Sequence, residues 1–293
     1  MGMADLIPGV SGGTVAFISG IYEELLYSIK KVSGEVIKLF LKRKFKKAFA
    51  EIPFGFLIPL GAGLLTAVIT LSRFLSFLLQ TYPIFIWSLF FGLVLASTWL
   101  VAKRVKKWKP GYLIAFLITA IAAYFIVGAV PVETPTTLPI FFLSGVIAII
   151  AMILPGISGS FILLLLGKYG QVLEAAKNLD MAVLFSVLAG AVVGLSIFSR
   201  VLTWLFERYH NISVAILAGF MFGSVRKLWP WKEVILSRTN SHGELVPIIE
   251  KNILPSQFDA STIFALALMI LGVGIVIYLN KLKLVEEHSD DIS

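Results

Sequence analysis

Two nearly identical hexapeptides interrupt apolar stretches of this chain and carry its clearest chemical signal. PGVSGG occupies residues 8–13, and PGISGS occupies residues 155–160, 147 positions later. Proline ends a helix, and the serine that follows can cap a new one. A helix that begins just after such a serine directs free N–H groups and the positive end of its dipole at the break. This arrangement suits an anion such as phosphate.

The predicted anion site combines backbone and hydroxyl groups from both motifs. Glycine has no side chain, so a ligand can approach the backbone closely there. The alternative is that each Pro-Gly pair is an independent structural kink with no ligand. The predicted phosphate-binding residues are Ser11, Gly12, Gly13, Thr14, Ser158, Gly159 and Ser160.

Two arginines form a second candidate group. Arg73 and Arg200 lie inside apolar segments, whereas every other Lys and Arg can be placed in a loop or near a helix end. A charge inside a membrane is costly and by default marks a site or an ion pair. The planar guanidinium group suits phosphate oxygens, so we predict that both arginines bind the same phosphate. The alternative is that both side chains snorkel to the lipid headgroups.

Three acidic residues lie near the first motif. Asp5 precedes the break, and Glu23 and Glu24 follow it. One of them could take up a coupling proton or hold an arginine when the site is empty; sodium is the other coupling ion considered. The alternative for the glutamates is an interfacial helix end. The three histidines show no metal-binding spacing and no catalytic motif occurs, so no cofactor, metal or enzymatic activity is expected.

The elements that must position these residues are membrane helices. Of the 293 residues 58% are hydrophobic and only 14% are charged, and the mean hydropathy is +0.93. Stretches of about 20 residues without charge can cross the hydrocarbon core as helices. We therefore predict an all-α polytopic membrane protein. The predicted spans are 54–79, 84–102, 111–130, 181–205, 212–225 and 262–280.

The chain also contains an internal repeat. Residues 8–26 align with 155–173, and residues 72–97 align with 199–224. Each half is interpreted as a re-entrant helical hairpin followed by three spans, although a single kinked spanning helix is the alternative to each hairpin. Interrupted helices at matching positions of two halves indicate a transporter's binding site. The first repeat is 1–137 with hairpin 4–26, and the second is 138–293 with hairpin 138–169.

The basic residues predict an orientation in the cell membrane. Three spans per half invert the second repeat, and the loops on one side then hold sixteen Lys and Arg against seven on the other. The basic side is the cytoplasm, with both termini and the basic loop 27–52. Residues 27–50 are predicted to form an amphipathic helix on anionic inner-leaflet lipids. The net charge of +8 is thus accounted for without nucleic acid, and homo-oligomerisation is left open.

The stretches GMADLIPGVSGGTVAFISGIYEELL and MILPGISGSFILLLLGKYGQVL resemble the bacterial and archaeal membrane family known as domain of unknown function 368. The resemblance implies a polyprenyl-phosphate transporter. Such a flippase would return undecaprenyl phosphate from the outer to the inner leaflet, where the carrier is reused for peptidoglycan and other envelope polymers. Family members usually have more residues before the first motif, which bears on the first arm of hairpin 4–26.

Two other classes of function use parts of the same pattern. A small-anion transporter or channel would need the paired helix breaks but no lateral opening to the bilayer. An intramembrane enzyme acting on lipid phosphate would need a nucleophile or a metal cluster, and the sequence offers neither clearly.

Overall fold

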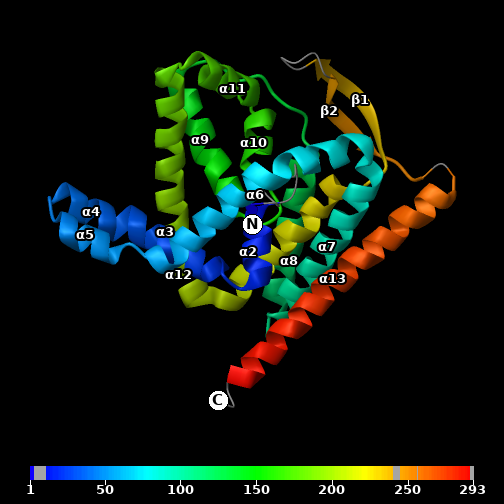
Figure 1. The fold of residues 1–293 in the computed structure, drawn as a ribbon, viewed down its shortest axis with the longest axis horizontal. Coiled ribbons are helices and arrows are strands. Elements are labelled where there is room, and N and C mark those ends of the chain that lie inside the picture. The colour runs from blue at the N-terminus through cyan, green and yellow to red at the C-terminus, as the bar shows by residue number, and fades with distance from the viewer. Residues whose placement is uncertain (3–10, 240–244, 256, 291–293) are drawn as a thin grey trace.

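Five of the described helices are long and apolar enough to cross a membrane, so the chain is a polytopic helical membrane protein. A computed structural model describes residues 1–2, 11–239, 245–255 and 257–290 (Figure 1). Its helices are α2 (Gly12–Ser19), α3 (Tyr22–Lys31), η1 (Val32–Val36, a π-helix), α4 (Ile37–Leu41), α5 (Phe45–Glu51), α6 (Phe54–Thr81), α7 (Pro83–Lys103), α8 (Pro110–Val127), α9 (Leu138–Ile153), α10 (Gly159–Leu165), α11 (Tyr169–Asn178), α12 (Met181–Ser224), η2 (Val225–Leu228, a 3-10 helix) and α13 (Ala260–Asp290). Strands β1 (Lys232–Thr239) and β2 (Leu245–Asn252) form an antiparallel ribbon.

The predicted spans 181–205 and 212–225 are joined in one kinked helix rather than separated by a loop. In α12 only Tyr209 departs from helical geometry, with φ −135° and ψ 48°. Tyr82, its partner in the sequence repeat, has φ −131° and ψ 51° at the junction of α6 and α7. The same backbone turn therefore joins the two helices of each aligned segment, and α12 can supply two crossings.

Glycines set the close helix contacts of the bundle. A Cβ atom on Gly92 in α7 would collide with Met269 of α13, and one on Gly219 in α12 would collide with Phe116 of α8. Gly190, earlier in α12, faces Phe142 of α9 in the same way. Small residues let membrane helices approach closely, so these glycines determine which helices pair.

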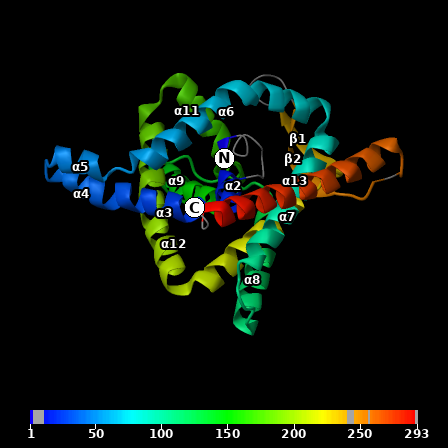
Figure 2. The same ribbon diagram turned by 60° about the horizontal axis from the view of Figure 1, so that its bottom comes forward.

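Two predicted loops have regular structure. The basic segment 27–52 consists of α3, η1, α4 and α5, and its last two helices extend away from the bundle in both views (Figures 1 and 2). Residues 226–261, which connect the predicted spans 212–225 and 262–280, hold η2 and the β-ribbon. Charge and turn residues dominate its composition, whereas the stretches KEVILSRT and LVPIIEKN contain the β-branched residues that favour strands.

Candidate functional site

The first motif packs on the end of α9. Ser11 has an extended backbone, with φ −112° and ψ 137°, and its Oγ accepts a hydrogen bond of 3.1 Å from the N–H of Gly13. The same hydroxyl donates to the backbone oxygen of Met152 at 3.2 Å. A Cβ atom on Gly13 would lie 2.8 Å from the backbone oxygen of Ile153, so only glycine fits there. The described part of the first motif therefore packs directly against the last turn of α9, just before the second break.

The second motif begins where α9 ends. Gly156 has φ +95°, a left-handed conformation that favours glycine, and a Cβ atom there would collide with Ser224 at the end of α12. A Cβ atom on Gly159 would lie 3.3 Å from Cβ of Met152. Met152 thus touches Ser11 through its carbonyl and faces Gly159 through its side chain. The two motifs adjoin through this one residue.

The same sequence of elements follows each motif. Ser11 and Ser158 both occupy the N-cap position of a short helix with an extended backbone, although only the Ser11 side chain accepts a capping hydrogen bond. Each helix ends at a left-handed glycine, Gly20 with φ 78° and Gly167 with φ 67°. A second helix then begins at a tyrosine in both cases, at the start of α3 and of α11. The described segments that follow the two motifs therefore have a similar local backbone, while the larger repeat stays a prediction.

Residues 138–169 fold back on themselves as a helical hairpin. The N–H of Val132 donates to Leu165 O at 2.7 Å, and Thr134 Oγ1 donates to Leu166 O at 2.7 Å. Lys168 Nζ donates to Thr134 O at 2.8 Å. The end of α10 is thus tied to the segment that enters α9, and the two helices lie side by side (Figure 1). The break at 154–158 lies at the closed end of this hairpin.

The motif hydroxyls differ in their surroundings. Ser158 Oγ and Ser160 Oγ lie 2.7 Å apart, and Ser160 is exposed. Thr14 is 1% exposed, and its Oγ1 has no hydrogen-bond partner among the described residues. A buried hydroxyl without a partner costs about 1–3 kcal/mol. Such a group is expected to serve a ligand that binds beside it.

Both predicted arginines are exposed, and no hydrogen bond joins either of them to the described motif residues. Arg73 in α6 is exposed, and within the described part of the chain it has no polar partner. Arg200 in α12 is exposed and donates from Nη2 to Ser33 O in η1 at 3.1 Å. A backbone oxygen is one of the partners expected for an empty-state arginine. Their role in binding phosphate stays a prediction.

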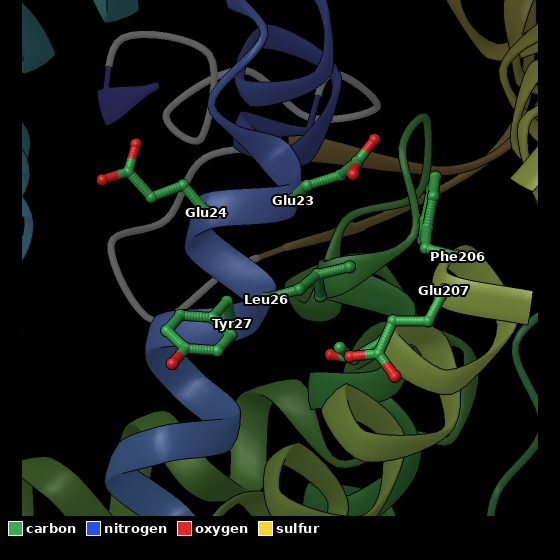
Figure 3. Close-up of a pocket in the computed structure, with 7 residues that line it drawn as sticks. Glu23, Glu24, Leu26, Tyr27, Phe206 and Glu207 are labelled. Atoms are coloured by element: carbon green, nitrogen blue, oxygen red, sulfur yellow. The ribbon is translucent and has the colours of Figure 1, made fainter.

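Two of the three acidic candidates line a pocket between α3 and α12. Asp5 falls outside the described residues. Glu23 Oε1 lies 3.3 Å from His210 Nε2, beside the kink of α12. Figure 3 shows Glu23 and Glu24 on opposite sides of α3. The pocket has a volume of about 310 Å³ and is lined by Glu23, Glu24, Leu26, Tyr27, Thr203, Phe206 and Glu207.

Tyr22 connects this pocket to the motifs and was not predicted as a site residue. Its hydroxyl donates to Ile153 O at 3.1 Å, and its side chain is buried against Phe17 and Phe206. The signal available in the sequence was the pairing of Tyr22 with Tyr169. His210 gave no such signal, because only the fold of α12 places it opposite Glu23.

Comparisons with known proteins give a consistent result. The model of a family described as "VCA0040-like: Undecaprenyl phosphate translocase-like" matches residues 1–246. A polyprenyl-phosphate transporter of Vibrio cholerae serotype O1 is 44% identical over 287 residues, covering 96% of this chain and 93% of the relative. A polyprenyl-phosphate transporter of Staphylococcus aureus is 31% identical over 249 residues, covering 78% of this chain and 83% of the relative. No solved structure matches the chain.

Proposed function

The chain belongs to the undecaprenyl phosphate translocase-like family, and from this premise we propose that it moves polyprenyl phosphate across the cytoplasmic membrane. The observation that carries the proposal is the meeting of the two motifs at Met152, with the buried, unpartnered hydroxyl of Thr14 in the first turn of the helix that follows Ser11. The direction proposed is from the outer to the inner leaflet, with the lipid carrier recycled for envelope synthesis.

The phosphate binds at the N-terminus of α2. The positive end of the helix dipole attracts an anion. Thr14, the third residue of α2, donates its otherwise unpartnered hydroxyl to a phosphate oxygen. The hydroxyls of Ser158 and Ser160 approach from the second motif and replace part of the water that the phosphate loses.

The two halves are proposed as inverted repeats, 1–137 and 138–293, each beginning with a re-entrant hairpin. Irregular backbone such as 154–158 is tolerated at membrane depth only inside protein or along a wet cavity. Gly13 packs closely against Ile153, and Gly156 packs closely against Ser224. These contacts support the burial of the irregular backbone inside the protein. The isoprenoid tail then stays in the hydrocarbon between helices while the headgroup crosses.

The basic residues support the proposed orientation. The kink of α12, the start of α8 and the C-terminal end of α13 lie at one end of the molecule, and the β-ribbon and α11 lie at the other (Figure 1). The first end carries the basic segment 103–109 and is assigned to the cytoplasm. The ribbon end is assigned to the outer face.

The test is flipping by purified protein in liposomes. A fluorescent short-chain polyprenyl phosphate is placed in both leaflets, and the fraction accessible to an added quencher is followed with and without a proton gradient. We expect protein-dependent exchange of the phosphate lipid and none of the matching polyprenol. Equal permeation of inorganic phosphate without lipid exchange would instead indicate a small-anion channel. Release of inorganic phosphate from the lipid would indicate an enzyme.

A further inference from the structure

A group of charged side chains at the ribbon end is not accounted for by the site described above. Glu250 in β2 accepts from two lysines through the same oxygen, Oε2. Lys227 Nζ in η2 lies 2.9 Å from this atom, and Lys232 Nζ in β1 lies 3.3 Å from it. We name Lys227, Lys232 and Glu250 the Lys–Glu cluster.

The Lys–Glu cluster holds more positive than negative charge in a partly buried place. The side chains of Lys227, Lys232 and Glu250 are 23%, 9% and 19% exposed. Two ammonium groups share one carboxylate, and the second carboxylate oxygen takes no part in these pairs. Partly buried charge that is not matched by an opposite charge is costly. An anion that bound here would remove the imbalance.

The pKa shifts of Lys232 and Glu250 agree with this charge count. Burial lowers the pKa of Lys232 to about 8, the charge of Glu250 raises it, and the charge of Lys227 lowers it further. Burial raises the pKa of Glu250, but the charges of Lys232 and Lys227 outweigh burial and hold it below its usual value. At neutral pH Glu250 is therefore ionised and Lys232 is mostly protonated.

An aromatic ring lies beside each of the two lysines. Lys232 Nζ lies 4.3 Å from the ring centre of Trp87 in α7. Lys227 Nζ lies 5.4 Å from the ring centre of Phe161 in α10. Trp229 packs against Phe91 of α7 with ring centres 5.6 Å apart. The cluster therefore has charged groups for a headgroup and an apolar rim that suits the beginning of a lipid tail.

The cluster is also connected to the second motif. Phe161 directly follows Ser160 and lies in the first turn of α10. Its ring is the neighbour of Lys227, so a phosphate held by Lys227 is one side chain away from the serine pair. The ribbon lies at the end of the molecule assigned to the outer face (Figure 1).

We propose that Lys227 and Lys232, with Glu250 as the counter-ion of the empty state, form an entry site that takes the phosphate group of the lipid from the outer leaflet before it reaches the motifs. The phosphate displaces Glu250 from one or both ammonium groups, because two lysines offer more hydrogen-bond donors than one carboxylate oxygen can use. This site rests on the proposed transport of polyprenyl phosphate, and it adds a place on the route that neither motif supplies.

The test is binding of short-chain polyprenyl phosphate to the purified full chain in detergent, followed by native mass spectrometry or thermophoresis. We expect Lys227→Gln and Lys232→Gln each to raise the Kd about tenfold, because each loses a charge-assisted hydrogen bond. Lys251→Gln is the matched control, since Lys251 is an exposed lysine of the same strand as Glu250 and the change in net charge is equal. Its Kd should stay within about twofold of wild type.

Glu250→Gln separates binding from a purely structural role. If the carboxylate competes with phosphate, its loss should lower the Kd several-fold even though the variant unfolds at a lower temperature. A structural role alone predicts that the variant is destabilised with an unchanged or higher Kd, and that result would overturn the proposal. Unchanged Kd values in both lysine variants would also overturn it.

Two further measurements keep the test decisive. Lys227→Arg and Lys232→Arg retain the charge and should bind within a few-fold of wild type if a Gln variant fails to fold. In the wild-type chain, acetylation of Lys227 and Lys232 should be slowed by polyprenyl phosphate but not by polyprenol; equal acetylation in both would count against the site. Inorganic phosphate is added as a competitor. If it protects the lysines as well as the lipid does at equal concentration, the site serves free phosphate instead.

The failure of this inference and of the proposed function give different results. If lipid binding depends on the Lys–Glu cluster but the protein does not flip the lipid in liposomes, the transport proposal is contradicted and the entry site stands. If the wild type flips the lipid but substitutions at Lys227, Lys232 and Glu250 leave the Kd unchanged, the entry site is contradicted and the transport proposal stands.

Discussion

Ser11 and Met152 are 141 residues apart in the chain, and the Ser11 hydroxyl donates to the Met152 carbonyl at 3.2 Å. That carbonyl lies in the last turn of α9, where the helix is about to end. The first motif is therefore positioned by the element that carries the second motif. A substitution at either helix break is therefore expected to alter the structure at the other break.

Thr14→Val should separate stability from transport. Valine has nearly the shape of threonine but no hydroxyl, so it removes a buried polar atom that has no partner among the described residues. The melting temperature should stay equal or rise, while flipping should fall at least about tenfold, since the phosphate loses a donor. Thr14→Ser, which keeps the hydroxyl, is the control. Full flipping by Thr14→Val would exclude Thr14 from the site.

Gly13→Ala should destabilise the protein strongly. The added Cβ would lie 2.8 Å from a backbone oxygen of α9, which cannot move aside as a flexible side chain could. We expect a loss of roughly 1–3 kcal/mol, typical of overpacking in a core, measured as a lower melting temperature in detergent. Gly170→Ala in α11 is the matched control, because no atom lies within 4 Å of its added Cβ. That variant should be as stable as wild type or more so.

Arg73→Lys and Arg200→Lys should impair transport and leave folding intact. Lysine keeps the positive charge but loses the planar fork that binds two phosphate oxygens. Both side chains are exposed, so the substitutions remove little packing. The measurement is flipping in liposomes beside a melting curve for each variant. Wild-type transport by both would show that these arginines only snorkel.

Glu23→Gln should abolish the response of transport to a proton gradient if this residue carries the coupling proton. Glu23 lines the pocket between α3 and α12 and lies 3.3 Å from His210, so a proton taken up there changes a contact between two helices. Glu24→Gln and Asp5→Asn are tested in parallel. Glu174→Gln, an exposed glutamate of α11, is the control. Retention of gradient-dependent transport in all three test variants would remove the coupling hypothesis.

The Lys–Glu cluster predicts opposite pH trends for stability and binding. The pKa of Lys232 is about 8 in the folded protein and higher in the unfolded chain, so the unfolded chain holds more protons between pH 8 and its ordinary pKa of 10.5. The contribution of Lys232 to folding stability therefore rises with pH in that window. Lipid binding should weaken over the same window, because the neutral amine no longer attracts phosphate. In Lys232→Gln both trends should be smaller, and an unchanged pH profile of binding would contradict the assignment.

The sequence by itself determined the membrane class, the approximate bounds of the long helices and the spacing of the two motifs. Apolar length sets where a helix can cross a bilayer, and Pro-Gly breaks set where it cannot continue; both are local properties. This is why α10 begins at Gly159, within the break predicted from proline and serine, and why the first three predicted spans correspond to α6, α7 and α8.

Only the tertiary structure decided which residues share a neighbourhood. The contact of Met152 with both motifs and the pairing of Glu23 with His210 each need helices that are distant in sequence to pack together. The Lys–Glu cluster needs β1 and β2 to pair in one register, with Lys232 directly opposite Asn252. Hydropathy and local propensity cannot predict such contacts. Each contact stabilises the fold only after two distant segments of the chain have come together.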